Sequence, residues 1–451
     1  MRILLIEPPF SPNQVHVRGF GLAEPLSLEV LAANLHNHDV RILDMRLDDD
    51  LERELNSFVP QVVGAGCYAT GLYVTKDVFA RVKRWSPEVL TVAGGHHASL
   101  IPEDFLDANI DVIVVGEGEV TLRELVEAHE EGKDLRQVAG LAIRKTDGSL
   151  EMTARRPLVD LDAMPWPDRK LTAGNRKNYF RGSWRPIMSL TTERGCPFRC
   201  SFCSMWKVNE GKYRVRSPES VVDEIASLES RHIDFIDDNT LHDVKRARAM
   251  YELLKERGID KFYKAYARSD TIVKHPDVIE KWREVGLKIV LVGLESFRDQ
   301  DLQSYGKRNT IANNEAAIRI LHANDVQICS YFVINPDYTE DDFRALGDYV
   351  DRWNLTHPIY TVLTPLPGTD LYCQVRDRLL TDNYEYYDFF HSVLPTRLPE
   401  KEFYRCFAEL WQRACSFKNL VRKLGRGDLS FSLSQVLGFR EFMRDLKALS
   451  V

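Results

Sequence analysis

Short apolar runs alternate with segments of helical periodicity throughout residues 1–150. The apolar runs are rich in Val, Ile and Leu and predict strands at 2–7, 40–44, 61–66, 89–95 and 111–119. Between them, apolar residues recur at helical spacing at 27–38, 73–85, 102–108 and 121–131. Strands that alternate with helices are typical of a parallel sheet covered by helices on both faces.

The same alternation resumes between residues 186 and 370, where it predicts six more strands. These are expected at 186–193, 233–237, 262–267, 288–295, 327–335 and 360–366. Helical patterns separate them at 218–231, 244–258, 275–286, 313–324 and 339–353. Six strand–helix units of this length are enough to close most of a barrel, and chemistry in a barrel is expected at the carboxyl ends of its strands.

Two segments lack this alternation. Residues 151–185 contain "PLVDLDAMPWPDRK", with three prolines and no clear period, which predicts a linker or an extended wrap between domains. Residues 371–451 are helical in pattern and more basic, since the stretch from 416 to 451 carries seven Lys or Arg against three Asp or Glu.

Composition narrows the class of protein. The chain has 451 residues, 44% hydrophobic and 28% charged, as expected of a soluble globular protein with two or three domains. The net charge of −7 gives no reason to expect nucleic acid as a partner. No apolar run approaches the roughly 20 residues of a spanning helix. "MRILLIEPPF" is too short and too acidic for a signal peptide, and eight mostly scattered cysteines indicate a reducing cytoplasm.

Glycines follow several predicted strands of the first half, in "VVGAG", "AGG" and "GEGE". Glycine lets a ligand approach the backbone closely, and ligands of open α/β sheets bind at the carboxyl ends of the strands. This half is therefore expected to bind a large, flat ligand.

Three cysteines lie within eight residues in "TTERGCPFRCSFCSMW": Cys196, Cys200 and Cys203, spaced C-x3-C-x2-C. Chance and a zinc site completed by a distant His or Cys are the alternatives. The spacing favours an iron–sulfur cluster, because three thiolates can hold three corners of a [4Fe–4S] cube. The fourth iron would then remain open for a substrate or cofactor.

With Phe202 before its last cysteine, this motif resembles the signature of radical S-adenosylmethionine (SAM) enzymes. In that family the cysteines hold the cluster and are essential for catalysis, while the open iron binds SAM. The resemblance implies that the reduced cluster cleaves SAM to a 5′-deoxyadenosyl radical, which abstracts hydrogen from an unreactive carbon.

Other segments resemble the SAM-binding parts of the family. "VGLES" implies that Glu295 contacts the SAM amino group, and "AYARSD" offers Arg268 for the carboxylate or ribose. Asn335 in "FVINPDY" falls near the adenine and ribose, and Ser204 and Met205 fall where the family's backbone meets adenine. Asp238 in "FIDDNTLHD" follows the second barrel strand, so by position it is expected to face the reactive cavity and to help position SAM or substrate. The alternatives are a surface carboxylate for Glu295, an ion pair for Arg268, a turn for Asn335 and helix capping for Asp238 or Asn239.

The first half resembles the cobalamin-binding domains of this family, on "GGHHASLIPEDFL" and "VIVVGEGEVTLRELVEA". The resemblance implies cobalamin contacts from strand-end loops, at Tyr68, Thr70, Gly71, Gly94, Gly95, His96, Gly116, Glu117 and Gly118. An ST-turn is the alternative for Thr70. Many cobalamin domains carry Asp-x-His-x-x-Gly after the second strand, but residues 44–50, "DMRLDDD", contain no histidine. No cobalt ligand is expected from this loop, and hydrogen bonding is preferred to metal ligation for His96 and His97.

Together the resemblances imply an α/β protein with four parts. Residues 1–150 form a Rossmann-like, doubly wound cobalamin-binding domain, 151–185 a linker, 186–370 a partial (β/α)6 TIM-like radical SAM barrel, and 371–451 a helical C-terminal region. The implied enzyme methylates an unactivated sp3 carbon through the radical and methylcobalamin. It uses a [4Fe–4S] cluster, SAM, cobalamin and a low-potential electron donor, flavodoxin or ferredoxin.

The substrate prediction rests on a narrower resemblance. The segments around the cysteines and from 270 to 372 are most similar to hopanoid C-3 methylases, which implies a hydrophobic lipid substrate. Aromatic residues of the C-terminal region would line its tunnel or, alternatively, form ordinary core; they are Tyr384, Tyr386, Tyr387, Phe389, Phe390 and Trp411. The basic tail would touch an inner-membrane surface or form a solvated amphipathic helix. Cyclisation, rearrangement, methylation of another natural product, and a non-catalytic cobalamin or iron–sulfur sensor remain alternatives.

Overall fold

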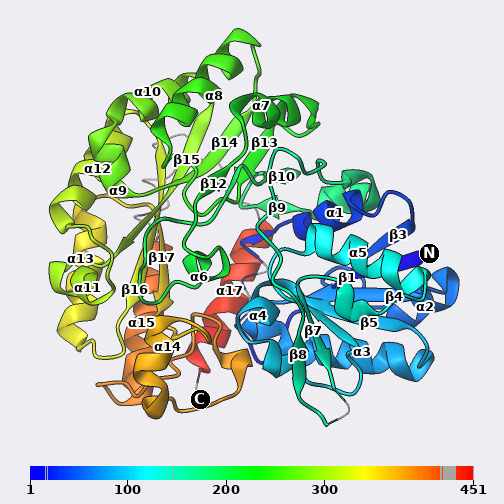
Figure 1. The fold of residues 1–451 in the computed structure, drawn as a ribbon. Coiled ribbons are helices and arrows are strands. Elements are labelled where there is room, and N and C mark those ends of the chain that lie inside the picture. Colours follow the sequence, from blue (N-terminus) through cyan, green and yellow to red (C-terminus); the bar gives the residue numbers. More distant parts are fainter. Residues whose placement is uncertain (16, 18, 146, 417–418, 420–432, 450–451) are drawn as a thin grey trace.

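The computed structural model describes residues 1–449 apart from 16, 18, 146, 417–418 and 420–432. Figure 1 shows two sheets, each flanked by helices, with the C-terminal helices beside the junction between them. Within the described ranges, no helix combines the length and the apolar character that crossing a bilayer would require.

The first sheet has seven strands, and its spatial order is β3 (Asp39–Asp44), β1 (Arg2–Glu7), β4 (Val62–Gly66), β5 (Leu90–Gly94), β6 (Val112–Val114), β7 (Leu141–Arg144) and β8 (Leu150–Met152). The five predicted strands are all present and pair in parallel. The predicted parallel sheet is confirmed, and β7 and β8, which were not predicted, extend it as an antiparallel ribbon. Helices α1 (Leu26–Ala33) and α5 (Gly118–Glu130) cover one face, while α2 (Leu51–Phe58) and α3 (Leu72–Trp85) cover the other.

The order of the parallel strands reverses between β1 and β4. The chain runs outward from β1 to β3, and then returns to place β4, β5 and β6 on the opposite side of β1. In doubly wound sheets the ligand crevice lies at this switch point, beyond the carboxyl ends of the strands. Glu7 ends β1 and Cys67 directly follows β4, so the two loops that leave these residues flank the crevice.

The second sheet has six parallel strands in chain order, as predicted: β10 (Ile187–Leu190), β13 (His232–Phe235), β14 (Phe262–Ala267), β15 (Leu287–Glu295), β16 (Gln327–Ile334) and β17 (His357–Val362). Its outer face is covered by α7 (Pro218–Ser227), α8 (Val244–Glu256), α10 (Pro276–Glu284), α12 (Ile311–Ala323) and α13 (Glu340–Arg352). On β14, Tyr263 and Ala265 belong to the core under these helices. Because side chains alternate along a strand, Lys264 and Tyr266 lie on the inner face.

Short elements complete the chain. They are β2 (Gly21–Leu22), β9 (Phe180–Arg181), β11 (Glu193–Arg194), β12 (Arg214–Val215), α4 (Gly95–Leu100), α6 (Met205–Val208), α9 (Ser269–Lys274), α11 (Asp299–Ser304) and α14 (Asp370–Val375). The segment 151–185 is not only extended, because it contains a 3-10 stretch, η4 (Arg169–Asn178), before β9. Strand β9 pairs with β2, so this segment returns to the N-terminal part of the chain.

The described C-terminal region contains α15 (Glu400–Ala414) and α17 (Leu433–Lys447). Phe442 of α17 packs edge-on against Phe20, Phe390 and Trp411. Tyr387, Phe390 and Trp411 are buried, which agrees with the alternative to a tunnel lining, whereas Tyr384 and Tyr386 are half-buried. Phe389 is 44% exposed, and its φ of 68° is unusual for an aromatic residue. Much of the basic tail lies outside the described residues.

Candidate functional site

The three clustered cysteines lie in the loop that follows β10, and none of them forms a disulfide. Burial raises the pKa of the Cys196 thiol to about 11 and that of Cys203 to about 12, and each is also raised by Cys200. The three sulfurs are thus close enough to influence one another. In the described part of the chain no three His, Cys, Asp or Glu side chains form a group that could hold a metal ion. In a [4Fe–4S] cluster each cysteine thiolate binds a different iron. The three sulfurs therefore do not need to surround a single metal ion.

Asp238 links this loop to the end of β13. Its carboxylate accepts a hydrogen bond from the Gly195 amide at 2.9 Å, directly before Cys196. Burial raises the pKa of Asp238 to about 6. The alternative of helix capping was wrong, since Asp243 caps α8 by accepting from the Arg246 amide.

Glu295 sits at a backbone irregularity at the end of β15. Its φ is 63°, and the pairing with β16 shifts register between Gly293 and Glu295. Strained residues and bulges are over-represented at functional sites. Oε1 of Glu295 accepts from Nζ of Lys307 at 2.5 Å, and both side chains are nearly buried. A Cβ on Gly293 would lie 2.3 Å from Oε1, so this glycine makes room for the carboxylate.

Arg268 and Asn335 also lie at strand ends, but both already have protein partners. Nε of Arg268 donates to Asp270 at 2.9 Å, and the guanidinium stacks on Phe198, within the cysteine loop, at 3.6 Å. Oδ1 of Asn335 accepts from the Asp337 amide at 3.0 Å, which is the turn considered as its alternative. Arg268 therefore supports the cysteine loop, whereas the side chain of Asn335 shapes its own turn.

Phe202 precedes the last cysteine, Cys203, and Met205 follows it. Phe202 packs edge-on against Tyr305, in a small apolar cluster with Val333 and Leu363. Met205 begins α6, and Nε1 of Trp206 in the same helix donates to the carbonyl of Cys200 at 3.3 Å.

The carboxyl ends of the two sheets meet through His96 and Ser204. His96 follows β5, and its Nε2 lies 2.9 Å from Oγ of Ser204, the residue after Cys203. Burial lowers the pKa of His96 to about 4, so the ring is neutral at pH 7. Residues expected to bind two different cofactors are thus in direct contact.

Tyr68 lies beside His96, with ring centroids 5.1 Å apart. Tyr68 is 67% exposed, and desolvation and the nearby carboxylates of Glu7 and Asp238 raise its pKa. Since Glu7 ends β1 and Asp238 follows β13, Tyr68 lies between the carboxyl ends of both sheets.

Two domain models match the chain in the order of these two sheets. The B12 binding domain matches residues 18–126, and the Radical SAM superfamily matches residues 190–350. A fold-level neighbour is the radical S-adenosylmethionine methyltransferase TsrM of Kitasatospora setae, solved with cobalamin and a [4Fe–4S] cluster bound. It is 19% identical with a TM-score of 0.70, and the match covers 91% of this chain and 88% of TsrM.

Two relatives align along most of their lengths. A hopanoid C-3 methylase of Methylococcus capsulatus is 29% identical over 419 residues, 90% of this chain and 78% of the relative. An uncharacterized methyltransferase of Pyrococcus horikoshii is 30% identical over 409 residues, 87% of this chain and 88% of the relative. The chain belongs to the cobalamin-dependent radical SAM methyltransferase family.

The cofactors of this family are a [4Fe–4S] cluster, SAM and cobalamin, as expected from the sequence. The residues of this family member fit them. Three free thiols cluster beside Asp238, and glycines with positive φ, Gly95 at 89° and Gly116 at 87°, border the crevice of the first sheet. Because burial raises the thiol pKa values, the cysteines must lose their protons when iron binds.

The individual cobalamin contacts stay predictions. Eight of the nine predicted residues share one location, and Glu117 is described separately below. The strand-end positions Tyr68, Thr70, Gly71, Gly94, Gly95, His96, Gly116 and Gly118 lie at the carboxyl edge of the first sheet. Thr70 lies in a 3-10 turn, η1 (Ala69–Gly71). In the loop 44–50, Asp44 pairs with Arg46 at 2.7 Å, which stabilises the loop without a metal.

Glu117 follows β6 and also stays a predicted cobalamin contact, but it already has protein partners. Its carboxylate accepts from Arg194 and Arg214 at 2.7 Å each, and from the Val159 amide at 2.8 Å. The two arginines belong to the β11–β12 ribbon of the radical SAM domain. Glu117 therefore joins the domains to each other.

Sequence reasoning missed Glu7 and Lys307. Burial raises the pKa of Glu7 to about 7, and its nearest cation, Nη1 of Arg46, is 3.7 Å away. Glu7 could have been identified from the sequence, because it is a charged residue at the end of a predicted buried strand. Lys307 follows α11 in a loop with no pattern of its own, and only the folded chain brings it to Glu295.

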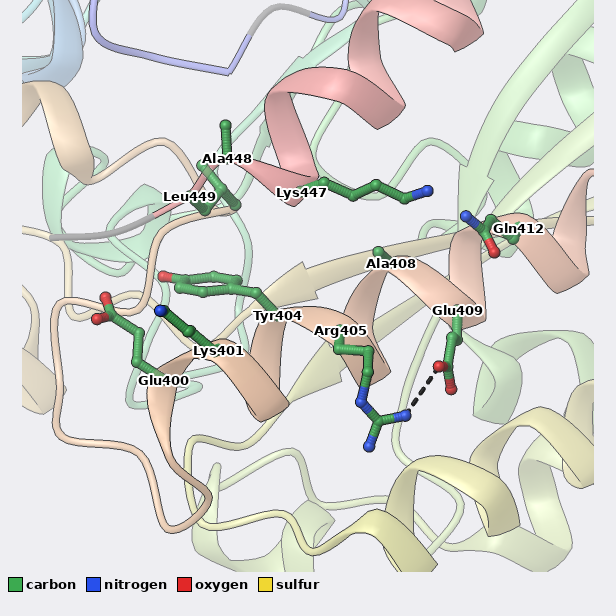
Figure 2. Close-up of a pocket in the computed structure, with 10 residues that line it drawn as sticks. All are labelled: Glu400, Lys401, Tyr404, Arg405, Ala408, Glu409, Gln412, Lys447, Ala448 and Leu449. Carbon is green, nitrogen blue, oxygen red and sulfur yellow. Dashed lines mark hydrogen bonds and ion pairs between the residues drawn. The ribbon is translucent and has the colours of Figure 1, made fainter.

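A surface hollow of about 570 Å³ lies between α15 and the end of α17 (Figure 2). Five of its ten lining residues are charged, and Arg405 pairs with Glu409 one turn along the same helix, α15, at 2.8 Å. None of the predicted site residues lines it, so it is separate from the cysteine loop.

We expect that replacing His96 by Ala weakens SAM binding although His96 lies in the B12-binding domain. Loss of the hydrogen bond to Ser204 frees the residue after Cys203, and a neutral hydrogen bond of about 1 kcal/mol corresponds to roughly fivefold in affinity. Equilibrium dialysis of the reconstituted protein with SAM measures this. The exposed His36→Ala serves as the control, and an affinity equal to that of His36→Ala would contradict the expectation.

Proposed function

We propose that the protein transfers a methyl group to an unactivated sp3 carbon of a largely apolar substrate. The observation that carries the proposal is the contact of 2.9 Å between His96 and Ser204. It brings the carboxyl edge of the first sheet against the cysteine loop of the second, so that a substrate between them faces both cofactors.

When bound, the cluster with SAM supplies a hydrogen-abstracting radical, and cobalamin supplies the methyl group. The residues of this chain hold and shield these groups. Cys196, Cys200 and Cys203 hold the cluster, and the Gly195 amide fixes Asp238 beside it. Glu295 offers a carboxylate to SAM, because Lys307 engages only its Oε1. The domain-joining bonds of Glu117 keep the two edges together and help to exclude water, which protects reactive intermediates.

A hopanoid-type lipid is the substrate that we propose to test first. The similarity to the hopanoid C-3 methylase supports it. So do Ile236, which follows β13, and Phe389, both large apolar side chains exposed near strand ends. Reduction would come from flavodoxin or ferredoxin. Contact of the basic tail with a membrane surface stays a proposal, because much of the tail lies outside the described residues.

Labelled methyl transfer tests this function. Anaerobic incubation of the reconstituted protein with deuterated-methyl SAM, cobalamin, a low-potential reductant and a lipid extract is expected to yield a lipid carrying the intact CD3 group. Omission of cobalamin is the matched control and should abolish the labelled product. Deoxyadenosine formation with an altered but unlabelled substrate would instead indicate cyclisation or rearrangement. Absence of both products would contradict the proposal.

A further inference from the structure

Two cations share a single carboxylate on the inner face of the second sheet. Nζ of Lys264 donates to Oδ1 of Asp234 at 2.8 Å, and Nε of Arg181 donates to Oδ2 of the same residue at 2.7 Å. Asp234 and Lys264 belong to neighbouring strands β13 and β14, whereas Arg181 reaches the barrel from β9, outside it. The cluster is therefore assembled by two parts of the chain.

The cluster carries one positive charge more than its carboxylate balances. Asp234 is the only carboxylate that pairs with either cation in the described part of the chain. The other close neighbours are the rings of Tyr266 and Tyr331 and the thiol of Cys329. Lys264 is buried against Asp234, whereas Arg181 is partly exposed and can bind a further anion.

Arg181 has free hydrogen-bonding capacity toward this anion. Its side chain is 41% exposed although Asp234 beside it is almost fully buried. Only Nε bonds to Asp234, and among the described residues neither Nη1 nor Nη2 donates to a protein acceptor. A guanidinium edge with two free N–H groups matches the two oxygens of a carboxylate.

The charged group of Asp234, Lys264 and Arg181 lies on the same side of β13 as the path that leads to the cysteine loop. Asp234 and Ile236 share the inner face of this strand, because Ile233 and Phe235 belong to the outer core. Ile236 is exposed, and Asp238 beyond it lies beside the cysteines. Four residues span at most about 14 Å of extended chain, which limits the distance from Asp234 to Asp238.

We propose that Arg181 anchors a carboxylate at the far end of an otherwise apolar substrate. The apolar body then lies along Ile236, and the reacting carbon lies near Asp238 and the cysteine loop. This proposal rests on the proposed function, since it assumes that the substrate occupies the space between the two sheets. It narrows the substrate class from apolar lipids to apolar carboxylic acids of limited length.

Binding of matched ligands tests the anchor. The protein is first reconstituted with the [4Fe–4S] cluster and cobalamin, without SAM or reductant. It is then titrated calorimetrically with a pentacyclic triterpenoid carboxylic acid, its methyl ester and the parent hydrocarbon. We expect the acid to bind at least roughly tenfold tighter than the ester, as for a charge-assisted, two-point contact. Arg181→Gln should remove this preference. Arg185→Gln, an exposed arginine four residues away, should keep it.

Equal binding of acid and ester, no binding of the acid, or an unchanged preference in Arg181→Gln would overturn the anchor. Thermal melting of Arg181→Gln establishes that the variant is folded. The titration includes no methyl transfer, so its failure leaves the proposed reaction intact. Conversely, methylation of a neutral lipid by Arg181→Gln at the wild-type rate would support the reaction and overturn the anchor.

Discussion

Replacing any one of Cys196, Cys200 and Cys203 by Ala is expected to reduce deoxyadenosine formation to background. Each thiolate is expected to hold a different corner of the cluster, and the other five cysteines lie outside this loop in the sequence. The wild-type protein should contain about four iron and four sulfide per chain after anaerobic reconstitution, as one [4Fe–4S] cluster requires. Each variant should lose most of this iron. Liquid chromatography of SAM cleavage products and colorimetric iron analysis measure the two effects.

Cys373→Ala is the matched control, because Cys373 is exposed and lies in α14, outside the loop. It should retain both iron and SAM cleavage. Deoxyadenosine formation by a loop variant at the rate of the control would contradict the radical assignment. A loop variant that keeps its iron but loses SAM cleavage would show that the cysteine acts on SAM rather than on the cluster.

The strands could be predicted from the sequence because each contains a short apolar run, buried almost throughout in β1, β4 and β5 and on alternate residues in β17. All six barrel strands and the five parallel strands of the first sheet lie where these runs occur. The β7–β8 ribbon could not be predicted in this way, since each strand has only three or four residues and its position depends on pairing with β6. Helix α2 was also missed, although the spacing of its buried Leu51, Leu55 and Phe58 is typical of an amphipathic helix.

The site could be predicted only where a local motif marks it. The three cysteines lie within eight residues, and Gly293 and Glu295 lie within the single motif "VGLES". In each case the local spacing indicates the chemistry. The partners that complete the site are distant in the chain: Ser204 is 108 residues from His96, and Arg181 is 53 residues from Asp234. Such contacts follow from the packing of two domains, and a single sequence contains no sign of them. Glu117 likewise pairs with Arg194 and Arg214, which are 77 and 97 residues away in the chain.

Glu295→Gln is expected to weaken SAM binding by roughly 10- to 100-fold, as for loss of a charged hydrogen-bond partner. The substitution keeps the size of the side chain and an oxygen for Lys307, but it removes the negative charge. Oε1 already accepts from Lys307, whereas Oε2 has no hydrogen-bond partner among the described residues. An ammonium group of SAM can therefore bind Oε2 without displacing the lysine. The strained φ of 63° holds the carboxylate in this orientation before SAM arrives.

Equilibrium dialysis of cluster-loaded protein with SAM gives the affinity, and iron content with thermal melting shows that the variant is intact. Glu256→Gln, an exposed carboxylate at the end of α8, is the matched control and should bind SAM as the wild type does. Lys307→Met separates the two roles of the pair. It leaves Glu295 buried without its cation, so it should lower the melting temperature, while the freed carboxylate still attracts the ammonium. An affinity of Glu295→Gln within twofold of the control would exclude Glu295 from SAM recognition and leave only its structural pairing with Lys307.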